Sequence, residues 1–493
     1  MVSTIVNEKK RQREIEKSFK ERKSNRYERK INKAKLKSRE ELDLFDWNKW
    51  NFANQDFWID PYVDTVDRID YRKVSKQEFI DKYEKPNIPV VITHGMDDWR
   101  ANEYWTEKYF LERYGKDLYK VGEDDDGNNV YMKMKHFLYY CQQEAAKDDS
   151  PMYIFDSGFY KDRKNNKKKS SSSNSNNNKK SKQSSSSDEN DDHDTTPNLK
   201  KQRYETSSLL EDYKVPHYFD DDLFQLTGSR RRPPYRWLVM GPARSGTGIH
   251  TDPLGTSAWN ALLKGHKRWA LFPPTTPKKI IDPPMKPYDH EGVSWFSQVF
   301  PKFKKRDDTT DVRTLGEKLG MIEVLQRPGE IIFVPGGWGH VVMNLDMTIA
   351  VTQNFCSPSN LEYVYLATRH SRPKLGAKLL RQIKKLGTTY PNSIYASLSN
   401  QLDSLQYTPQ IPPSSSDSSS SSSTSSSSSS SSNSDSSTAF VLSSTTNQLT
   451  KKEKIVVSST DSDTDLSDGT CMCQKCKIKR KKEKLKNELK NKK

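Results

Sequence analysis

At 493 residues the chain is long enough for two to four domains, but only 32% of it is hydrophobic, 30% is charged and its mean hydropathy is −0.96, so part of it is not expected to enter a folded core. It has no run of eighteen apolar residues, no apolar stretch of a secretory signal near its start and only five cysteines, which argues against a membrane-bound or disulfide-rich protein and favours the reducing cytosol or nucleus. The net charge of +17 predicts attraction to anions, nucleic acid first.

The first segments in chain order are a basic arm and a globular part. Residues 1–40 carry 15 Lys/Arg against 6 Glu, which predicts a basic arm that is either helical or a solvated tail. Residues 41–160 have a globular texture and are expected to pack on the core. Within them, residues 75–83 and 105–114 show helical spacing, and residues 89–93 are typical of a buried strand.

An insertion then separates this globular part from a β-rich core. Residues 161–203 are rich in Lys, Asn and Ser, carry a net charge of +6 and are predicted to be a disordered loop. Residues 204–360 contain short apolar or alternating runs punctuated by Pro and Gly, which favours a barrel or jelly roll. Residues 361–400 are predicted to form helices beside it.

Two further segments follow, and the basic one among them shows that the positive charge is concentrated near the two ends of the sequence. Residues 401–470 are Ser-rich and predicted to be disordered. Residues 471–493 form a basic tail of net charge +9, which fits a nuclear localisation signal, a nucleic-acid patch or a simple solvated tail. The stretch between the two basic termini sums to −1 with the insertion and to −7 without it. We therefore predict a mildly acidic enzyme suited to basic peptides, with separable basic tails for targeting or RNA contact.

One histidine has the surroundings of a metal ligand. Of nine histidines, only His250 has an acid two residues downstream, Asp252. Because residues i and i+2 of a strand share a face, one strand can direct both side chains at one metal. A third ligand is available in His340, 88 residues beyond Asp252 and after a Pro-Gly-Gly turn. Two His and one carboxylate are typical of non-haem Fe(II) oxygenases; the alternative is a structural or surface histidine.

A lysine and a polar strand face suggest a bound anion nearby. Lys267 lies in the run KRWALF, with Trp269 on the same face, in a strand expected to run beside that of His250. A lysine inside a barrel requires an anion, and a dicarboxylate cosubstrate would serve; the alternative is a surface lysine in a turn. His340 and Asn344 also share a face by the period of two.

The final strand of the core alternates in the same way. Small or polar side chains fall on one face and apolar ones on the other, with Thr348, Ala350, Thr352 and Asn354 on the first and Ile349, Val351 and Phe355 on the second. This pattern suits either a ligand-lined lumen or a solvent-exposed face.

Two long segments of the chain resemble the JmjC domain of Fe(II)- and 2-oxoglutarate-dependent oxygenases. They are GPARSGTGIHTDPLGTSAWNALLKGHKRWALFPP and PGEIIFVPGGWGHVVMNLDMTIAVTQNF. With shorter matching segments, the resemblance covers about residues 28–160 and 204–400. It implies a mostly β core, a double-stranded β-helix of the jelly-roll or cupin-like type, with flanking α-helices and long disordered tails. It also implies Fe(II), 2-oxoglutarate and O₂ as cofactor and cosubstrates.

By position, the resemblance implies three sets of site residues. The iron ligands would be His250, Asp252 and His340. The 2-oxoglutarate contacts would be Lys267, which pairs with the far carboxylate, together with Asn260, Asn344, Thr352 and, near the cosubstrate, Tyr153. Thr247 would lie on the substrate side of the pocket.

The chain departs from the family at one position beside this site. Gly339 directly precedes His340, where family members usually have an aromatic residue. The change is expected to alter packing beside the histidine and to leave the ligand set intact.

Within the family, the resemblance points to nuclear members that hydroxylate lysines at C5 in Arg/Ser-rich splicing factors and for which histone arginine demethylation is described. It implies basic protein substrates, namely splicing factors and histones, and no membrane partner. Two alternative functions stay open: an RNA- or splicing-factor-binding scaffold with an inactive core, and a metal-binding cupin without oxygenase chemistry. RNA contact through the basic tails and a homo-oligomer formed through the C-terminal helices are further expectations.

Overall fold

The computed structural model describes residues 25–59, 63–124, 126–160, 208–229, 231–284, 291–306 and 312–405. The predicted insertion at 161–203, the basic tail at 471–493, and all but the first five residues of the predicted Ser-rich segment lie outside these ranges. The segment boundaries predicted there stay predictions.

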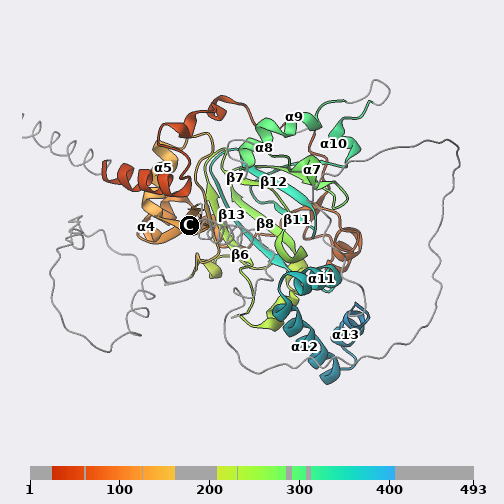
Figure 1. The fold of residues 1–493 in the computed structure, drawn as a ribbon. Helices are drawn as coiled ribbons and strands as arrows, with labels where there is room; N and C mark the ends of the chain where they lie inside the picture. Colours follow the sequence, from red (N-terminus) through yellow and green to blue (C-terminus); the bar gives the residue numbers. More distant parts are fainter. Residues whose placement is uncertain are drawn as a thin grey trace, which may run out of the picture.

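Two mainly antiparallel sheets form the core (Figure 1). The larger has the order β1-β2-β11-β8-β13-β6-β5, and the smaller β10-β9-β12-β7. The larger consists of β1 (Arg68–Asp70), β2 (Val90–Thr93), β5 (Ile154–Asp156), β6 (Arg236–Gly241), β8 (Ser257–Lys264), β11 (Ile331–Val334) and β13 (Thr348–Phe355). The smaller consists of β7 (Gly246–His250), β9 (Lys267–Phe272), β10 (Ile322–Gln326) and β12 (Gly339–Asn344). A separate hairpin is formed by β3 (Leu118–Glu123) and β4 (Asn129–Lys133).

The two faces of β13 have different surroundings, which settles the alternative left by its alternating pattern. Ile349 and Val351 belong to the large apolar cluster that includes the buried Trp259, whose ring is stacked on Phe219 with centroids 6.0 Å apart. Ala350, on the other face, packs with apolar side chains of its neighbouring strands β6 and β8. Thr352 of the small and polar face pairs with Asn260, which pairs with Ile332, and Ile332 belongs to an apolar cluster with Trp269 of the smaller sheet. This face is therefore directed between the sheets and is not a solvent-exposed surface. This arrangement confirms the predicted jelly-roll core.

Helices cover the core on several sides (Figure 1). Residues 25–38 are helical. They are followed by α2 (Lys76–Phe79), the π-helical turn η4 (Ile80–Glu84), α3 (Ala101–Tyr104), α4 (Glu107–Tyr114) and α5 (Met134–Gln143). The region between β9 and β10 adds α7 (Lys278–Ile281), α8 (Gly292–Gln298), α9 (Phe300–Phe303) and α10 (Leu315–Lys318), and the predicted C-terminal helices are α11 (Leu361–Ser371), α12 (Pro373–Thr389) and α13 (Ile394–Leu405). Short 3-10 turns are η1 (Asp46–Asn48), η2 (Phe52–Asn54), η5 (Leu209–Glu211), η6 (His217–Phe219), η7 (Leu223–Thr227) and η8 (Pro253–Gly255).

The predicted helices of the N-terminal part begin at hydroxyl caps. The side chain of Ser75 accepts the backbone N–H of Glu78, and that of Thr106 accepts the N–H of Tyr109. Each cap satisfies a backbone donor that the first helical turn leaves without a partner. None of the helices in the described ranges has both the length and the apolar composition needed to cross a bilayer.

The described part of the predicted basic arm is packed against the molecule. Ile31 is fully buried, and Lys35 is nearly so. The Lys35 ammonium donates to Asp148 Oδ1 at 2.8 Å and lies 4.8 Å from the centroid of the Trp47 ring. The alternative of a solvated tail is therefore wrong for residues 25–38, because apolar contacts and a buried ion pair hold this helix in place.

A side chain from a neighbouring helix, α7, fills the space beside Gly339. A Cβ atom added at Gly339 would lie 2.9 Å from Cδ1 of Ile281, the last residue of α7. Ile281 is buried, and its carbonyl accepts the indole N–H of Trp295 at 2.7 Å. Ile281 thus occupies the space in which a larger side chain at position 339 would lie.

We predict that Gly339→Phe lowers the free energy of unfolding by about 1–3 kcal/mol through overpacking. Combining it with Ile281→Ala should recover stability, because the truncated side chain frees the volume that the phenyl ring needs. A double-mutant cycle measured by chemical denaturation should give a favourable coupling of about 1 kcal/mol or more. Simple additivity of the two losses would show that Ile281 does not fill this space.

Candidate metal centre

The register of two antiparallel strands brings the two predicted histidines together. β12 pairs with β7 so that His340 lies directly opposite His250, with a β-bulge between His340 and Val342. The two imidazole centroids are 4.2 Å apart. One potential ligand atom from each of His250, Asp252 and His340 lies within 4.8 Å of the other two. The structure therefore gathers the three side chains into a cluster that can hold a metal ion.

Asp252 reaches the cluster from just beyond its strand. β7 ends at His250, and Asp252 instead precedes the first residue of η8, with extended backbone angles (φ −61°, ψ 143°). The expectation that one strand carries both ligands is thus wrong in detail. Two successive side chains i and i+2 still reach one point, because extended backbone gives the same alternation as a strand.

Both imidazoles are held with one nitrogen directed to the cluster and the other to the backbone. Nδ1 of His250 lies 2.8 Å from the carbonyl oxygen of Gly248, and Nδ1 of His340 lies 3.1 Å from that of Trp338. A carbonyl oxygen only accepts, so each Nδ1 carries the proton and each Nε2 has a lone pair for a metal. Burial, reinforced by the neighbouring His250, lowers the pKa of His340 to about 4, which favours the neutral, ligating form.

A buried lysine lies on the other neighbour of β12, opposite Asn344, which shares a face with His340. The prediction that its strand runs beside that of His250 is wrong, because β12 lies between β9 and β7. Lys267 is opposite Asn344, and its ammonium donates to Asn344 Oδ1 at 2.6 Å. Only 2% of Lys267 is exposed, which excludes a surface lysine. Burial lowers the pKa of its ammonium to about 7, and the charge of Asp346 offsets only part of this effect.

The remaining predicted cosubstrate contacts lie on both sheets, with Asn344 opposite this lysine and Thr352 opposite Asn260. Asn344 also donates through Nδ2 to Ser245 Oγ at 2.9 Å. Thr352 pairs with Asn260 across β13 and β8, and its hydroxyl donates to the carbonyl of Trp259 at 2.8 Å. The buried Oδ1 of Asn260 has no hydrogen-bond partner among the residues described. Rotating this amide would offer an N–H donor to an anion.

Tyr153 and Thr247 form a separate contact at the edge of this group. The Tyr153 hydroxyl lies 3.0 Å from Thr247 Oγ1. Behind them, Gly241 leaves room: an added Cβ would lie 2.6 Å from Tyr153 Cβ and 3.2 Å from Asn344 Nδ2. Sequence reasoning did not identify the roles of Gly241 or of Ser245, since neither belongs to a pattern that indicates contact with distant strands.

The residues present fit a divalent transition metal beside an anion. Two neutral imidazoles and one carboxylate form a donor set with open positions. The buried Lys267 ammonium has a neutral amide as its hydrogen-bond partner, and burying such a charge is costly unless an anion pairs with it. The Trp269 ring lies 6.1 Å from that of His340 and adds apolar cover.

Comparison with known proteins agrees with this geometry. A family model described as a cupin-like domain matches residues 75–360. The chain is 40% identical over 358 residues to the bifunctional arginine demethylase and lysyl-hydroxylase psr-1 of Caenorhabditis briggsae, and 39% identical over 358 residues to that of Caenorhabditis elegans. Each alignment covers 72% of this chain and 77% of the relative.

A shorter similarity concerns the chemistry of the core. The chain is 32% identical over 154 residues to the 2-oxoglutarate and iron-dependent oxygenase JMJD4 of Danio rerio, which covers 31% of this chain and 34% of that protein. The domain match, the extent of the nematode similarity and the cluster beside a buried lysine agree with one another. The chain belongs to the cupin-like JmjC family of 2-oxoglutarate- and iron-dependent oxygenases.

Proposed function

We propose that this chain is a dioxygenase that hydroxylates lysine side chains of nuclear proteins at C5, with Arg/Ser-rich splicing factors as substrates. The observation that carries the proposal is the cluster of His250, Asp252 and His340 beside the buried Lys267. The relatives at 39–40% identity are named as both lysyl-hydroxylases and arginine demethylases. Demethylation of histone arginines is for that reason the second candidate activity.

In this proposal the three clustered side chains hold Fe(II), and Lys267 binds the far carboxylate of 2-oxoglutarate. When bound, iron and 2-oxoglutarate supply, with O₂, the oxidising power that hydroxylation of a C–H bond requires. Asn260, Asn344 and Thr352 would position the cosubstrate, and Tyr153 would lie near it. Thr247, held by the Tyr153 hydroxyl, would face the substrate.

The chain's own part in the reaction is to bind, orient and exclude water. The backbone carbonyls of Gly248 and Trp338 fix the tautomer and the ring plane of both histidines. Asn344 holds the Lys267 ammonium at a defined place and is itself held by Ser245. Placing these groups before the substrate arrives removes the reorganisation that would otherwise slow the reaction.

Location and partners form part of the same proposal. The basic tail at 471–493 supports nuclear import, and the basic termini support RNA contact. Assembly into a homo-oligomer through α11–α13 stays a prediction.

The activity is tested by incubating the full chain with Fe(II), 2-oxoglutarate and a lysine-containing Arg/Ser-rich peptide. We expect succinate to form with a peptide mass increase of about one oxygen atom, and His250→Ala to reduce turnover by roughly 100-fold or more, because a metal ligand is lost. His94→Asn, which changes an exposed histidine away from the cluster, is the matched control. Equal turnover by His250→Ala and the wild type would refute the site assignment.

The same reaction separates the competing functions. Formaldehyde released from a methyl-arginine peptide would identify demethylation, which leaves no added oxygen on the product. Salt-sensitive RNA binding that survives removal of iron, without turnover of any peptide, would identify a scaffold with an inactive core. Metal binding without 2-oxoglutarate binding would identify a cupin of another chemistry.

The shifted pKa of Lys267 predicts how 2-oxoglutarate affinity depends on pH. The free lysine loses its proton near pH 7, whereas a bound carboxylate favours the ammonium. Binding therefore takes up a proton at higher pH. The dissociation constant should be constant below pH 7 and rise by up to about tenfold per pH unit above it.

Calorimetric titration with 2-oxoglutarate between pH 6 and 8.5 measures this dependence. Lys267→Met should weaken binding on the order of 100-fold, since a buried charge-assisted bond is lost. Lys267→Arg keeps a permanent charge and should remove the dependence on pH. A wild-type affinity that does not change between pH 7 and 8.5 would contradict the role given to Lys267.

A further inference from the structure

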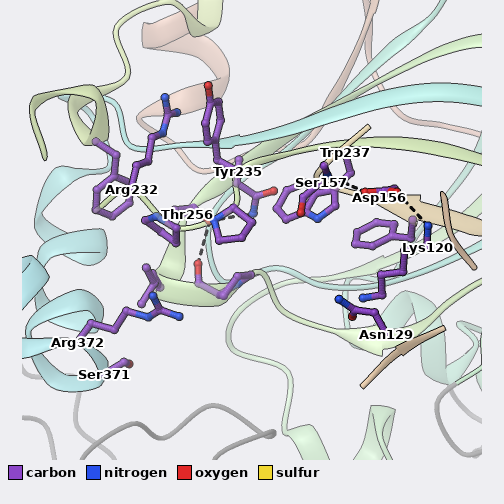
Figure 2. Close-up of a pocket in the computed structure, with 18 of the residues that line it drawn as sticks. Lys120, Asn129, Asp156, Ser157, Arg232, Tyr235, Trp237, Thr256, Ser371 and Arg372 are labelled. Carbon is purple, nitrogen blue, oxygen red and sulfur yellow. Dashed lines mark hydrogen bonds between the residues drawn. The ribbon is translucent and has the colours of Figure 1, made fainter. Parts of the chain in front are cut away.

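A cavity of about 890 Å³ lies beside the segment that follows Asp252, and Figure 2 shows residues that line it. Pro253 and Leu254, which directly follow Asp252, form one wall. Asn354 and Trp237 form another, and both belong to strands that carry or contact Thr352. The cavity then extends between the β3–β4 hairpin and the junction of α11 and α12. It is large enough for several residues of an extended peptide, and its wall at Pro253 is adjacent in the chain to the candidate ligand Asp252.

Aromatic side chains line the middle of the cavity, and its one lining carboxylate is hydrogen-bonded to the backbone. Phe155 is stacked on Trp237, with centroids 5.4 Å apart and planes inclined by 21°. The lining residues include one acid, Asp156. Its Oδ1 accepts the N–H of Gly158 at 2.7 Å and its Oδ2 that of Lys120 at 2.9 Å. Both oxygens of this buried carboxylate are therefore already held by backbone N–H groups.

Cationic side chains lie at both ends of the cavity. Some of them form ion pairs with carboxylates, and one does not. Figure 2 shows Lys120 at one end, and Arg232 and Arg372 at the other. Lys120 donates to Glu123 at 2.6 Å, and Arg232 is paired with Asp222. Arg372 is exposed and forms no ion pair with any carboxylate in the described ranges. Uncompensated positive charge thus remains at the α11–α12 end.

Further cations lie along α12. Residues spaced by four, three and four positions share one face of a helix, and on α12 these are Lys374, Lys378, Arg381 and Lys385. All four are exposed or half-buried, and α12 contains no acid. Asp403 of α13 pairs with Lys384, which lies beside this row. We call Arg372 and these four residues the α12 basic row.

The length of the α12 basic row determines how many residues of an extended peptide could lie along it. Lys385 lies eleven helical positions after Lys374, a rise of roughly 17 Å. About five residues of extended peptide span that distance. The row begins at the rim of the cavity because Arg372 belongs to both. A chain that leaves the cavity at this end would therefore meet cations at successive turns of the helix.

We propose that the protein substrate lies in the cavity and carries anionic side chains, phosphoserine or acidic residues, in the roughly five positions that follow along the α12 basic row. The inference rests on the proposed function and deepens it by naming a feature of the substrate next to the target lysine. We name a polypeptide as the occupant because the proposed function acts on protein side chains and the row begins at the rim of a cavity whose wall follows Asp252; a nucleic acid is an outcome of the test. The partner's charge complements a surface that would otherwise repel a uniformly basic peptide.

The test uses the full chain and peptides that contain one lysine and a flank of serine, phosphoserine, glutamate or lysine on either side. Dissociation constants from fluorescence anisotropy and kcat/KM from succinate release are measured together. Anionic flanks on one side should improve binding and kcat/KM by about three- to tenfold over serine, mainly through KM, and lose this advantage in high salt. A lysine flank should weaken both.

Charge reversal locates the effect on the molecule. The variant with Lys378→Glu and Arg381→Glu should abolish or invert the preference, whereas Lys302→Glu, which changes an exposed cation of α9, should retain it. Circular dichroism should show that each variant is folded, since these side chains are not in the core. Comparing the variants also separates the α12 basic row from the basic termini, which are the same in all.

Three outcomes would overturn the inference. The first is equal affinity for all four flanks, and the second is an anionic preference that survives reversal of the α12 basic row. The third is single-stranded RNA that binds to this row while the peptide flank has no effect. Failure of every peptide to turn over would refute the proposed function instead, and the anisotropy measurements would still decide whether anionic flanks bind at α12.

Discussion

The register of β12 is the constraint on which the candidate site depends. This strand pairs with β7 on one side, which sets His340 opposite His250, and with β9 on the other, which sets Asn344 opposite Lys267. His340 and Asn344 share a face because they are four residues apart in a strand. A slip of one residue would turn both away from the space between the sheets. One strand thereby fixes the distance between the metal cluster and the buried ammonium.

Glycines allow the backbones around β12 to approach one another. A Cβ added at Gly246 of β7 would lie 2.1 Å from the carbonyl oxygen of Val342, and one at Gly292 of α8 would lie 2.6 Å from the same atom. Neither contact is compatible with a side chain. The bulge beside His340 and the start of α8 therefore pack against the same short stretch of β12. The helices between β9 and β10 thus support the metal-binding edge of the smaller sheet.

Local patterns in the sequence predicted which side chains share a face, and the structure agrees for Lys267 with Trp269 and for His340 with Asn344. They did not predict which strands are neighbours, so β12 was not expected between β9 and β7. Sheet order depends on contacts between distant segments, and a period of two contains no information about them. The same reason applies to Ser245 beside Asn344, to Ile281 beside Gly339 and to the cavity that ends at α12.

The central claim is that β7 and β12 form an iron site next to a carboxylate-binding lysine. Anomalous diffraction at the iron absorption edge, from crystals grown without oxygen in the presence of Fe(II) and 2-oxoglutarate, measures it most directly. The account predicts one strong anomalous peak within bonding distance of His250, Asp252 and His340, with 2-oxoglutarate density reaching Lys267. A peak at another place, or iron at the cluster with the cosubstrate directed away from Lys267, would contradict it.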